Sequence, residues 1–339
     1  DDATTSSSQD FSLANNNKTS LFDFEVSLCS VTKDAEAYLT EWIDYHLLAV
    51  GFDEIHLIDN SVNFDLEQWF LNTRDHPIYK RVTIDHDPTP PYTKGKSNIV
   101  QQAAFRKCVQ KYSKGKKANK VFYALYDTDE FLVFPTPTSP YSDVHELIRD
   151  YLMPYGGALS ISCRFFGTSN KTIYSPQPVL KRFQYRENQT SHVIKSMVQA
   201  NHLKTVRNPH SVITKGNATT HTTLHPGAVL QSKGAFASDG QRPDQIAVLH
   251  HYRYLSEKEY HAKLCVRGRF GADWCRLQKP TKSSNSNNKT ATQNKYTKHF
   301  PEHASAKPGT VFDDTAWKTL SEHVPKYRIY DRPEWQDYT

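Results

Sequence analysis

The chain has 339 residues, of which 37% are hydrophobic and 12% aromatic. This composition suits a packed globular protein and excludes a fibrous or disordered one. The formal net charge of +6 favours anionic ligands, but the Lys and Arg residues are dispersed, so nucleic acid is not expected as a partner. No apolar stretch approaches the roughly 18 to 20 residues that cross a bilayer. A membrane is therefore expected only through an anchor absent from this chain.

The first predicted elements alternate between strand and helix. An amphipathic helix at 35–50 lies between strands at 24–31 and 54–58, and Gly51 follows it where a left-handed cap residue is expected. The alternation continues with helices and strands at 66–71, 82–85, 98–111 and 121–126. This order favours a parallel sheet with helices on both faces.

The later half is less regular. A helix is expected at 142–151, with Ser142 as its N-cap, and a strand at 158–163. Strand-like segments follow at 179–185, 192–198 and 246–249. Residues 1–20 predict a disordered stem or linker, and residues 279–297 a mobile surface loop. The tail from Thr310 is rich in aromatic residues and is expected to pack on the domain; they are Trp317, Tyr327, Tyr330 and Trp335.

Five cysteines are too few and too scattered to predict a disulfide scaffold. Cys29 and Cys163 lie in apolar runs and are expected to be buried free thiols. Cys265 and Cys275 are close enough in sequence to pair in an oxidising compartment. N-glycosylation sequons favour a secretory lumen; they lie at Asn17, Asn170, Asn188, Asn217 and Asn288.

Two carboxylates follow the strand at 121–126. In an extended segment, Asp127 and Asp129 point to the same face and Glu130 to the other. Such a pair can share one hard divalent cation with diphosphate oxygens. An Asp-x-Asp pair alone is also common in turns and helix caps, but its position between two apolar runs makes a solvated turn less favoured.

Other polar groups follow strands in the same way. His250 and His251 come directly after the apolar run 246–249, and imidazole is an acceptable ligand for manganese. A histidine pair alone is more often structural or solvated. Asp59 follows the strand at 54–58, and the carboxyl ends of strands are where doubly wound sheets bind ligands.

Together these residues resemble glycosyltransferase family 92 and its family 2-like relatives. The dispersed motifs fall in that family's order over roughly residues 26–271. They are Val31-Thr32-Lys33-Asp34-Ala35-Glu36, Glu41-Trp42-Ile43-Asp44-Tyr45-His46, Asp59-Asn60-Ser61, Gln102 to Cys108, Asp127 to Phe131, Phe166-Gly167-Thr168-Ser169, Lys195-Ser196-Met197-Val198, and His251-Tyr252-Arg253 with Ser256, Lys263, Arg267 and Gly268.

The resemblance implies a GT-A fold: an α/β, Rossmann-like and mostly parallel central sheet flanked by helices, with a smaller acceptor-side β element. It implies one domain over 21–339, with a nucleotide-binding half to about residue 135 and an acceptor half after it. Mn²⁺ or another divalent cation would be held by Asp127, Asp129 and His251 or His250. Donor contacts would come from Lys33, Glu36, Asp59, Asp127, Lys195 and Arg253. Lys33 and Glu36 also fit a solvated helix start, Asp59 a turn, and Lys195 and Arg253 solvated strand ends.

The implied activity is metal-dependent transfer of a sugar, with galactose from UDP-galactose favoured, to a glycan hydroxyl with inversion. Candidates for the base are Asp244, His210 and Asp273, although each also fits a structural role. Arg164 stands where a tryptophan is expected, which affects recognition of the donor sugar or acceptor. The alternatives are a catalytically silent sugar-binding protein of the same fold and a metal-dependent phosphoesterase. The expected location is the Golgi or secretory lumen, with the cytoplasm as the alternative.

Overall fold

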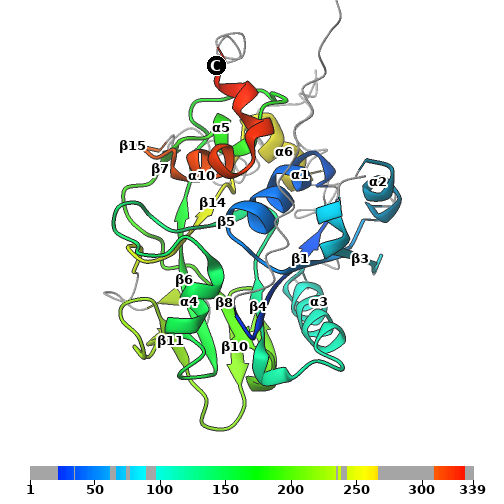
Figure 1. Ribbon diagram of the computed structural model, residues 1–339. Helices are drawn as coiled ribbons and strands as arrows, with labels where there is room; N and C mark the ends of the chain where they lie inside the picture. Colours follow the sequence, from blue (N-terminus) through cyan, green and yellow to red (C-terminus); the bar gives the residue numbers. More distant parts are fainter. Residues whose placement is uncertain are drawn as a thin grey trace, which may run out of the picture.

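The computed structural model describes residues 22–33, 35–61, 66–73, 77–88, 97–233, 236–237, 243–265 and 309–332. Its centre is a nine-stranded sheet (Figure 1). Eight strands follow one another across the sheet, and β11 (Thr220–Thr222) pairs with β6 beside this path. The order is β3 (Val82–His86), β2 (Glu54–Asp59), β1 (Glu25–Thr32), β4 (Val121–Leu125), β8 (Ile194–Gln199), β6 (Ala158–Phe165), β14 (Val248–His251) and β5 (Glu130–Val133).

The sheet is mostly parallel. Strands β3, β2, β1, β4, β6, β14 and β11 run one way, and β8 and β5 run the other way. The carboxyl ends of β4, β6 and β14 therefore meet the amino ends of β8 and β5 at one edge of the sheet. We call this the carboxyl edge and the opposite one the amino edge.

Helices cover both faces of the sheet, as the strand and helix alternation predicts. On one face, α3 (Ser97–Tyr112) packs Phe105 and Val109 against alternate residues of β1 and β4, including Cys29 and Tyr123. On the other face, a larger core joins the intervening residues of these strands to three helices. They are α1 (Glu36–Asp44), α4 (Val144–Tyr151) and α10 (Thr315–His323). The expected α/β fold class is confirmed.

Helix α1 extends into the π-helical turn η1 (Tyr45–Ala49). Its apolar face is buried as its spacing predicts, and Trp42 donates from Nε1 to the Glu130 carbonyl oxygen at 2.8 Å. Gly51 follows with φ +89°, and a Cβ there would lie 2.3 Å from an oxygen of Asp143. Both the backbone angle and the space therefore require glycine.

Two local expectations are wrong. The N-cap of α4 is Asp143 rather than Ser142: the Asp143 side chain accepts a hydrogen bond from the His145 amide. A carboxylate one residue later satisfies the same free amide. The segment at 179–185 is not a strand throughout. It begins as the helical turn α5 (Val179–Arg182), because the Glu41 carboxylate accepts from the Val179 and Leu180 amides.

Smaller elements surround the sheet. The described residues include three two-stranded ribbons: β9 (Leu203–Asn208) with β10 (Ser211–Thr214), β12 (Ser232–Lys233) with β13 (Phe236–Ala237), and β7 (Tyr185–Arg186) with β15 (Val311–Phe312). The same part of the chain also contains helices α2 (Leu66–Thr73) and α6 (Glu257–Cys265) and the short turns η2 (Pro77–Arg81), η3 (Ala118–Lys120), η4 (Ala200–His202) and η5 (Pro325–Asp331).

The aromatic tail packs on the domain, as predicted. Trp317 and Tyr327 are buried, and the Tyr327 hydroxyl donates to Asp44 at 2.7 Å. Trp335, like the stem at 1–20 and the loop at 279–297, lies outside the described residues. Among the helices that are described, none is both long and apolar enough to cross a membrane. The expected boundary near residue 135 stays a prediction.

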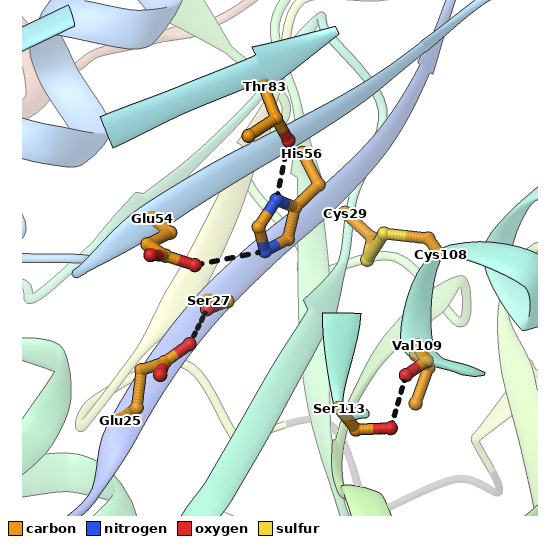
Figure 2. The surroundings of a disulfide bond; sticks show 9 residues. All are labelled: Glu25, Ser27, Cys29, Glu54, His56, Thr83, Cys108, Val109 and Ser113. Carbon is orange, nitrogen blue, oxygen red and sulfur yellow. Dashed lines mark hydrogen bonds and ion pairs between the residues drawn. A yellow bond between two sulfur atoms is a disulfide. The ribbon is translucent and has the colours of Figure 1, made fainter. Parts of the chain in front are cut away.

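The cysteines differ from expectation at one position. Cys29 of β1 is not a free thiol but forms a disulfide with Cys108 of α3, with 6.3 Å between their Cα atoms (Figure 2). The two are 79 residues apart, and only the crossing of α3 over the sheet brings them together. Cys163 is a buried free thiol, as predicted. The predicted pair Cys265 and Cys275 is not tested, because both side chains lie outside the described residues.

Candidate active site

The paired aspartates lie at the carboxyl edge, between β4 and β5. They do not lie in an extended segment: the Glu130 amide donates to the Asp127 carbonyl oxygen at 3.1 Å and closes a tight turn. The expectation that Glu130 points away is therefore wrong. Because the chain reverses here, the alternation of an extended strand does not apply. All three carboxylates belong to the same cluster.

Asp127 is held from two sides. Its Oδ2 accepts from the Lys195 ammonium at 2.6 Å, and its Oδ1 accepts from the Gln101 side chain on α3. Lys195, near the start of β8, is fully buried and also lies 3.1 Å from Glu130 Oε2. Burial raises the pKa of Asp127, but the charge and hydrogen bond of Lys195, together with the charge of His251, outweigh burial and lower the pKa below its ordinary value.

Asp129 has a different pair of partners. Its Oδ2 accepts from the Lys263 ammonium on α6, and its Oδ1 lies 3.5 Å from His251 Nε2. Burial acts to raise the pKa of Asp129. The charges of Lys263 and His251 outweigh burial and hold that pKa well below its usual range. The carboxylate is thus ionised across the ordinary pH range.

Behind the aspartates lies a buried group of possible metal ligands: Glu130, Cys163 and His251. Their ligand atoms lie within 4.8 Å of one another. Glu130 Oε1 and His251 Nδ1 are buried and lie 3.4 Å apart, and neither has a hydrogen bond among the described residues. Burial raises the pKa of Glu130 to about 7, against the opposing charge of Lys195. Burial also raises the pKa of the Cys163 thiol, which is therefore neutral.

This set of groups fits a divalent cation. Carboxylate oxygens and imidazole nitrogens are ligands that Mn²⁺ accepts. Asp127 and Asp129 stay partly exposed, with side chains 28% and 19% accessible, so a solvated ion can reach them. Glu130 Oε1 and His251 Nδ1 contact each other at 3.4 Å but make no hydrogen bond among the described residues, so a nearby cation or its bound water would satisfy them.

The two histidines are separated by the alternation of strand β14. His251 faces the carboxylates, whereas His250 lies 3.7 Å from Asp313 in the C-terminal segment. Burial lowers the pKa of His250 to about 3, so its imidazole is neutral. Asp313 is paired in turn with Arg186 at 2.6 Å. The structure brings only His251 to the aspartates.

The predicted donor contacts occupy the same edge. Asp59 is the last residue of β2 and is buried, where it accepts from the Ser61 amide at 2.9 Å. Lys33 directly follows β1 and is half-buried. Arg253 follows β14, and its buried Nε has no partner among the described residues. Glu36 begins α1, but its side chain lies outside the description. Lys195 lies beneath the carboxylates rather than at the surface.

The three candidate bases have different surroundings. Asp244 is bound by the Arg164 guanidinium and the Thr190 hydroxyl. His210, in the turn between β9 and β10, lies within electrostatic range of Lys195 and Asp127. Burial and the charge of Lys195 lower the pKa of His210 to about 4, and its Nδ1 has no partner among the described residues. Asp273 lies outside the described residues.

Four residues of this cluster have no predicted role from the sequence: Gln101, Glu130, Cys163 and Lys263. Glu130 directly follows the aspartates, so the sequence shows that it is near them but does not show that its side chain points toward them. Lys263 belongs to the motifs that resemble the family, yet its spacing gives no role. Gln101 is 26 residues from Asp127, and Lys263 is 134 residues from Asp129, so only tertiary structure brings them together.

The sequence profile of glycosyltransferase family 92 matches residues 22–306, most of the chain. The chain belongs to glycosyltransferase family 92. The match includes the whole candidate site, from Lys33 to Lys263. Family 92 membership and the mostly parallel sheet agree with the expected GT-A type of fold. No curated protein matches this family 92 chain.

The solved structures that this chain matches include S. aureus TarS and a mannosyltransferase. The S. aureus TarS structure is 14% identical with a TM-score of 0.30, and the match covers 52% of this chain and 28% of TarS. The mannosyltransferase PcManGT from Pyrobaculum calidifontis, in complex with GDP-Man and Mn²⁺, is 13% identical with a TM-score of 0.35. That match covers 94% of this chain and 84% of PcManGT.

Proposed function

We propose that this chain is a metal-dependent glycosyltransferase that moves a sugar from a nucleotide-sugar to a glycan hydroxyl. The observation that carries the proposal is the joining of Asp127, Asp129 and His251 at the carboxyl edge. They come from two strands far apart in sequence, and both aspartates remain accessible. Family membership supports the reaction class.

In this proposal Asp127, Asp129 and His251 hold Mn²⁺ or a similar cation. When bound, that cation supplies the positive charge that stabilises a leaving nucleoside diphosphate. Lys195 holds Asp127 ionised and in place from below. Lys33, Glu36, Asp59 and Arg253 lie in segments at the same edge and are assigned to the donor.

The base is assigned to His210. Asp244 is engaged by Arg164, whereas the imidazole of His210 is neutral at neutral pH and its buried Nδ1 has no hydrogen-bond partner among the described residues. A neutral imidazole can take the proton from an acceptor hydroxyl as that oxygen attacks the donor sugar. A pKa near 4 makes it a weak base, and the negative charge of a bound diphosphate would raise that pKa. Inversion and a UDP-galactose donor are assigned from the family resemblance.

A secretory location is part of the proposal. The Cys29–Cys108 disulfide requires an oxidising compartment to persist. Three sequons lie in the described part of the chain, and their asparagines, Asn170, Asn188 and Asn217, are all exposed. Both observations support the Golgi or secretory lumen.

The testing experiment is thermal unfolding with Mn²⁺ and a panel of nucleotides and nucleotide-sugars. A ligand that binds the native state raises the melting temperature by mass action. We expect Mn²⁺-dependent stabilisation by a nucleoside diphosphate and one nucleotide-sugar, which then serves as donor in acceptor screens. Asp127→Ala should abolish the response and lower transfer by about 10³-fold.

The matched control is Asp23→Asn, which removes an exposed carboxylate at the amino edge. It should respond as the wild type does. Full turnover by Asp127→Ala at saturating donor would contradict the metal site. Nucleotide binding without either transfer or donor hydrolysis would favour a silent sugar-binding protein instead.

A further inference from the structure

The two aspartates differ in how their cationic partners are placed. Lys195, on Asp127, is fully buried, and its ammonium lies between two carboxylates, Asp127 at 2.6 Å and Glu130 at 3.1 Å. Lys263, on Asp129, keeps a quarter of its side chain exposed. Moving Lys195 would leave buried carboxylates without a cation, whereas Lys263 can leave Asp129 for solvent or for another anion.

Asp129 has no carboxylate oxygen without a neighbour. Oδ2 is taken by Lys263, and Oδ1 faces His251 Nε2. A cation that binds Asp129 together with His251 must share or replace the Lys263 contact, because two positive charges on one carboxylate repel each other. Competition at this carboxylate is therefore built into the arrangement.

The helix that carries Lys263 is fixed one turn earlier. Glu259 accepts two hydrogen bonds from Arg182, at 2.8 and 2.9 Å, and another from the Tyr38 hydroxyl at 2.9 Å. Glu259 and Arg182 are both buried. The backbone at Lys263 is thus held beside the site, while its four-carbon side chain can change direction.

We propose that Lys263 is a two-position cation: it pairs with Asp129 when no donor is bound and with the donor's diphosphate when a divalent cation takes Asp129. This inference rests on the proposed function. It makes the site prefer the metal together with the nucleotide over the metal alone. The ammonium displaced from Asp129 lies where a diphosphate bound to the same cation carries its negative charge.

The test measures two affinities on Lys263→Met. Mn²⁺ alone is titrated by electron paramagnetic resonance, and UDP and GDP are titrated by calorimetry at saturating Mn²⁺. Removing the competitor should tighten binding of Mn²⁺ alone by about threefold. Losing a charged donor to phosphate should weaken nucleotide binding by roughly tenfold. We therefore expect Lys263→Met to tighten the binding of Mn²⁺ alone and to weaken the binding of the nucleotide.

Lys258→Met is the matched control, because Lys258 is exposed on the same helix. It should change neither affinity, and Lys263→Arg should keep nucleotide affinity by keeping the charge. Melting curves of each variant check folding. Equal weakening of Mn²⁺ and nucleotide binding by Lys263→Met, or no change in either, overturns the inference alone. A wild type that binds neither Mn²⁺ nor nucleotide overturns the proposed function as well.

Discussion

The two edges of the central sheet are both charged, but their charges are arranged differently. At the amino edge, Lys116 lies 2.7 Å from Glu25 and 3.1 Å from Glu54. His145 likewise lies 2.7 Å from Asp53 and 2.8 Å from Asp143. Each of these carboxylates has a cation in contact. The arrangement ties β1, β2 and α4 together through ion pairs in which every carboxylate is matched by a cation.

At the carboxyl edge, burial and charge are not balanced in this way. Three carboxylates share two lysines, and three buried polar atoms, of Glu130, His251 and His210, make no hydrogen bond among the described residues, against His56 Nε2 beside Glu54 at the amino edge. Each unsatisfied buried polar atom costs about 1 to 3 kcal/mol of folding free energy. The comparison indicates that the amino edge serves stability, whereas the carboxyl edge gives up stability to keep groups ready for a ligand.

The largest effect is expected from Lys195→Met. It leaves Asp127 and Glu130 without their shared buried cation, so the free energy of unfolding should fall by about 4 kcal/mol. Urea denaturation measures it. The control is Lys116→Met, because Lys116 is a half-exposed lysine that contacts two carboxylates at the amino edge. Its free energy of unfolding should fall by less than about 1 kcal/mol. Equal losses would remove the distinction between the edges.

The disulfide joins α3 to β1, and α3 runs along the sheet from one edge toward the other. This helix contributes Gln101 to Asp127 at one edge and stacks Tyr112 on His56, with ring centroids 3.7 Å apart, toward the other (Figure 2 shows His56 and Cys108). Replacing Cys29 and Cys108 by alanine should lower the free energy of unfolding by about 3 kcal/mol, because the unfolded chain gains freedom.

Chemical denaturation with and without a reductant measures the disulfide effect. The wild type should lose stability on reduction, and Cys163→Ala should retain that response, since Cys163 is a buried free thiol outside the disulfide. If the denaturation midpoint of the wild type is the same with and without reductant, the disulfide contributes nothing to stability.

A smaller effect is expected at His145, and it depends on pH. Burial lowers the pKa of His145, but the hydrogen bonds with Asp143 and Asp53 outweigh it and raise the pKa to about 9. A folded-state pKa above the unfolded value means that this stability is fully present below about pH 6.5 and is lost as pH rises through about 9.

His145→Gln should therefore lose on the order of 2 kcal/mol at pH 6, with the difference from wild type shrinking toward pH 10. Denaturation at a series of pH values measures it. Nucleotide affinity should stay unchanged, because His145 lies at the amino edge. A difference that does not vary with pH would show that packing against Phe22, rather than charge, is what His145 contributes.

Much of the site was predictable because its residues directly follow the ends of strands. The order of strands and helices places Asp127 and His251 after parallel strands, whose carboxyl ends share an edge. Alternation also implies that only one of His250 and His251 can face the aspartates. The sequence does not say which, because that depends on the register of β14 beside β5.

By itself, the amino-acid sequence determined the α/β order, the left-handed turn at Gly51 and the paired aspartates beyond β4, because periodicity and strand ends are local properties. Tertiary structure alone decided the direction of Glu130, the Cys29–Cys108 link and the contacts of Lys195 and Lys263. Lys195 is 68 residues from Asp127, and Lys263 is 134 residues from Asp129. Ion pairs over such separations follow from how strands and helices cross in space, and no local spacing encodes that crossing.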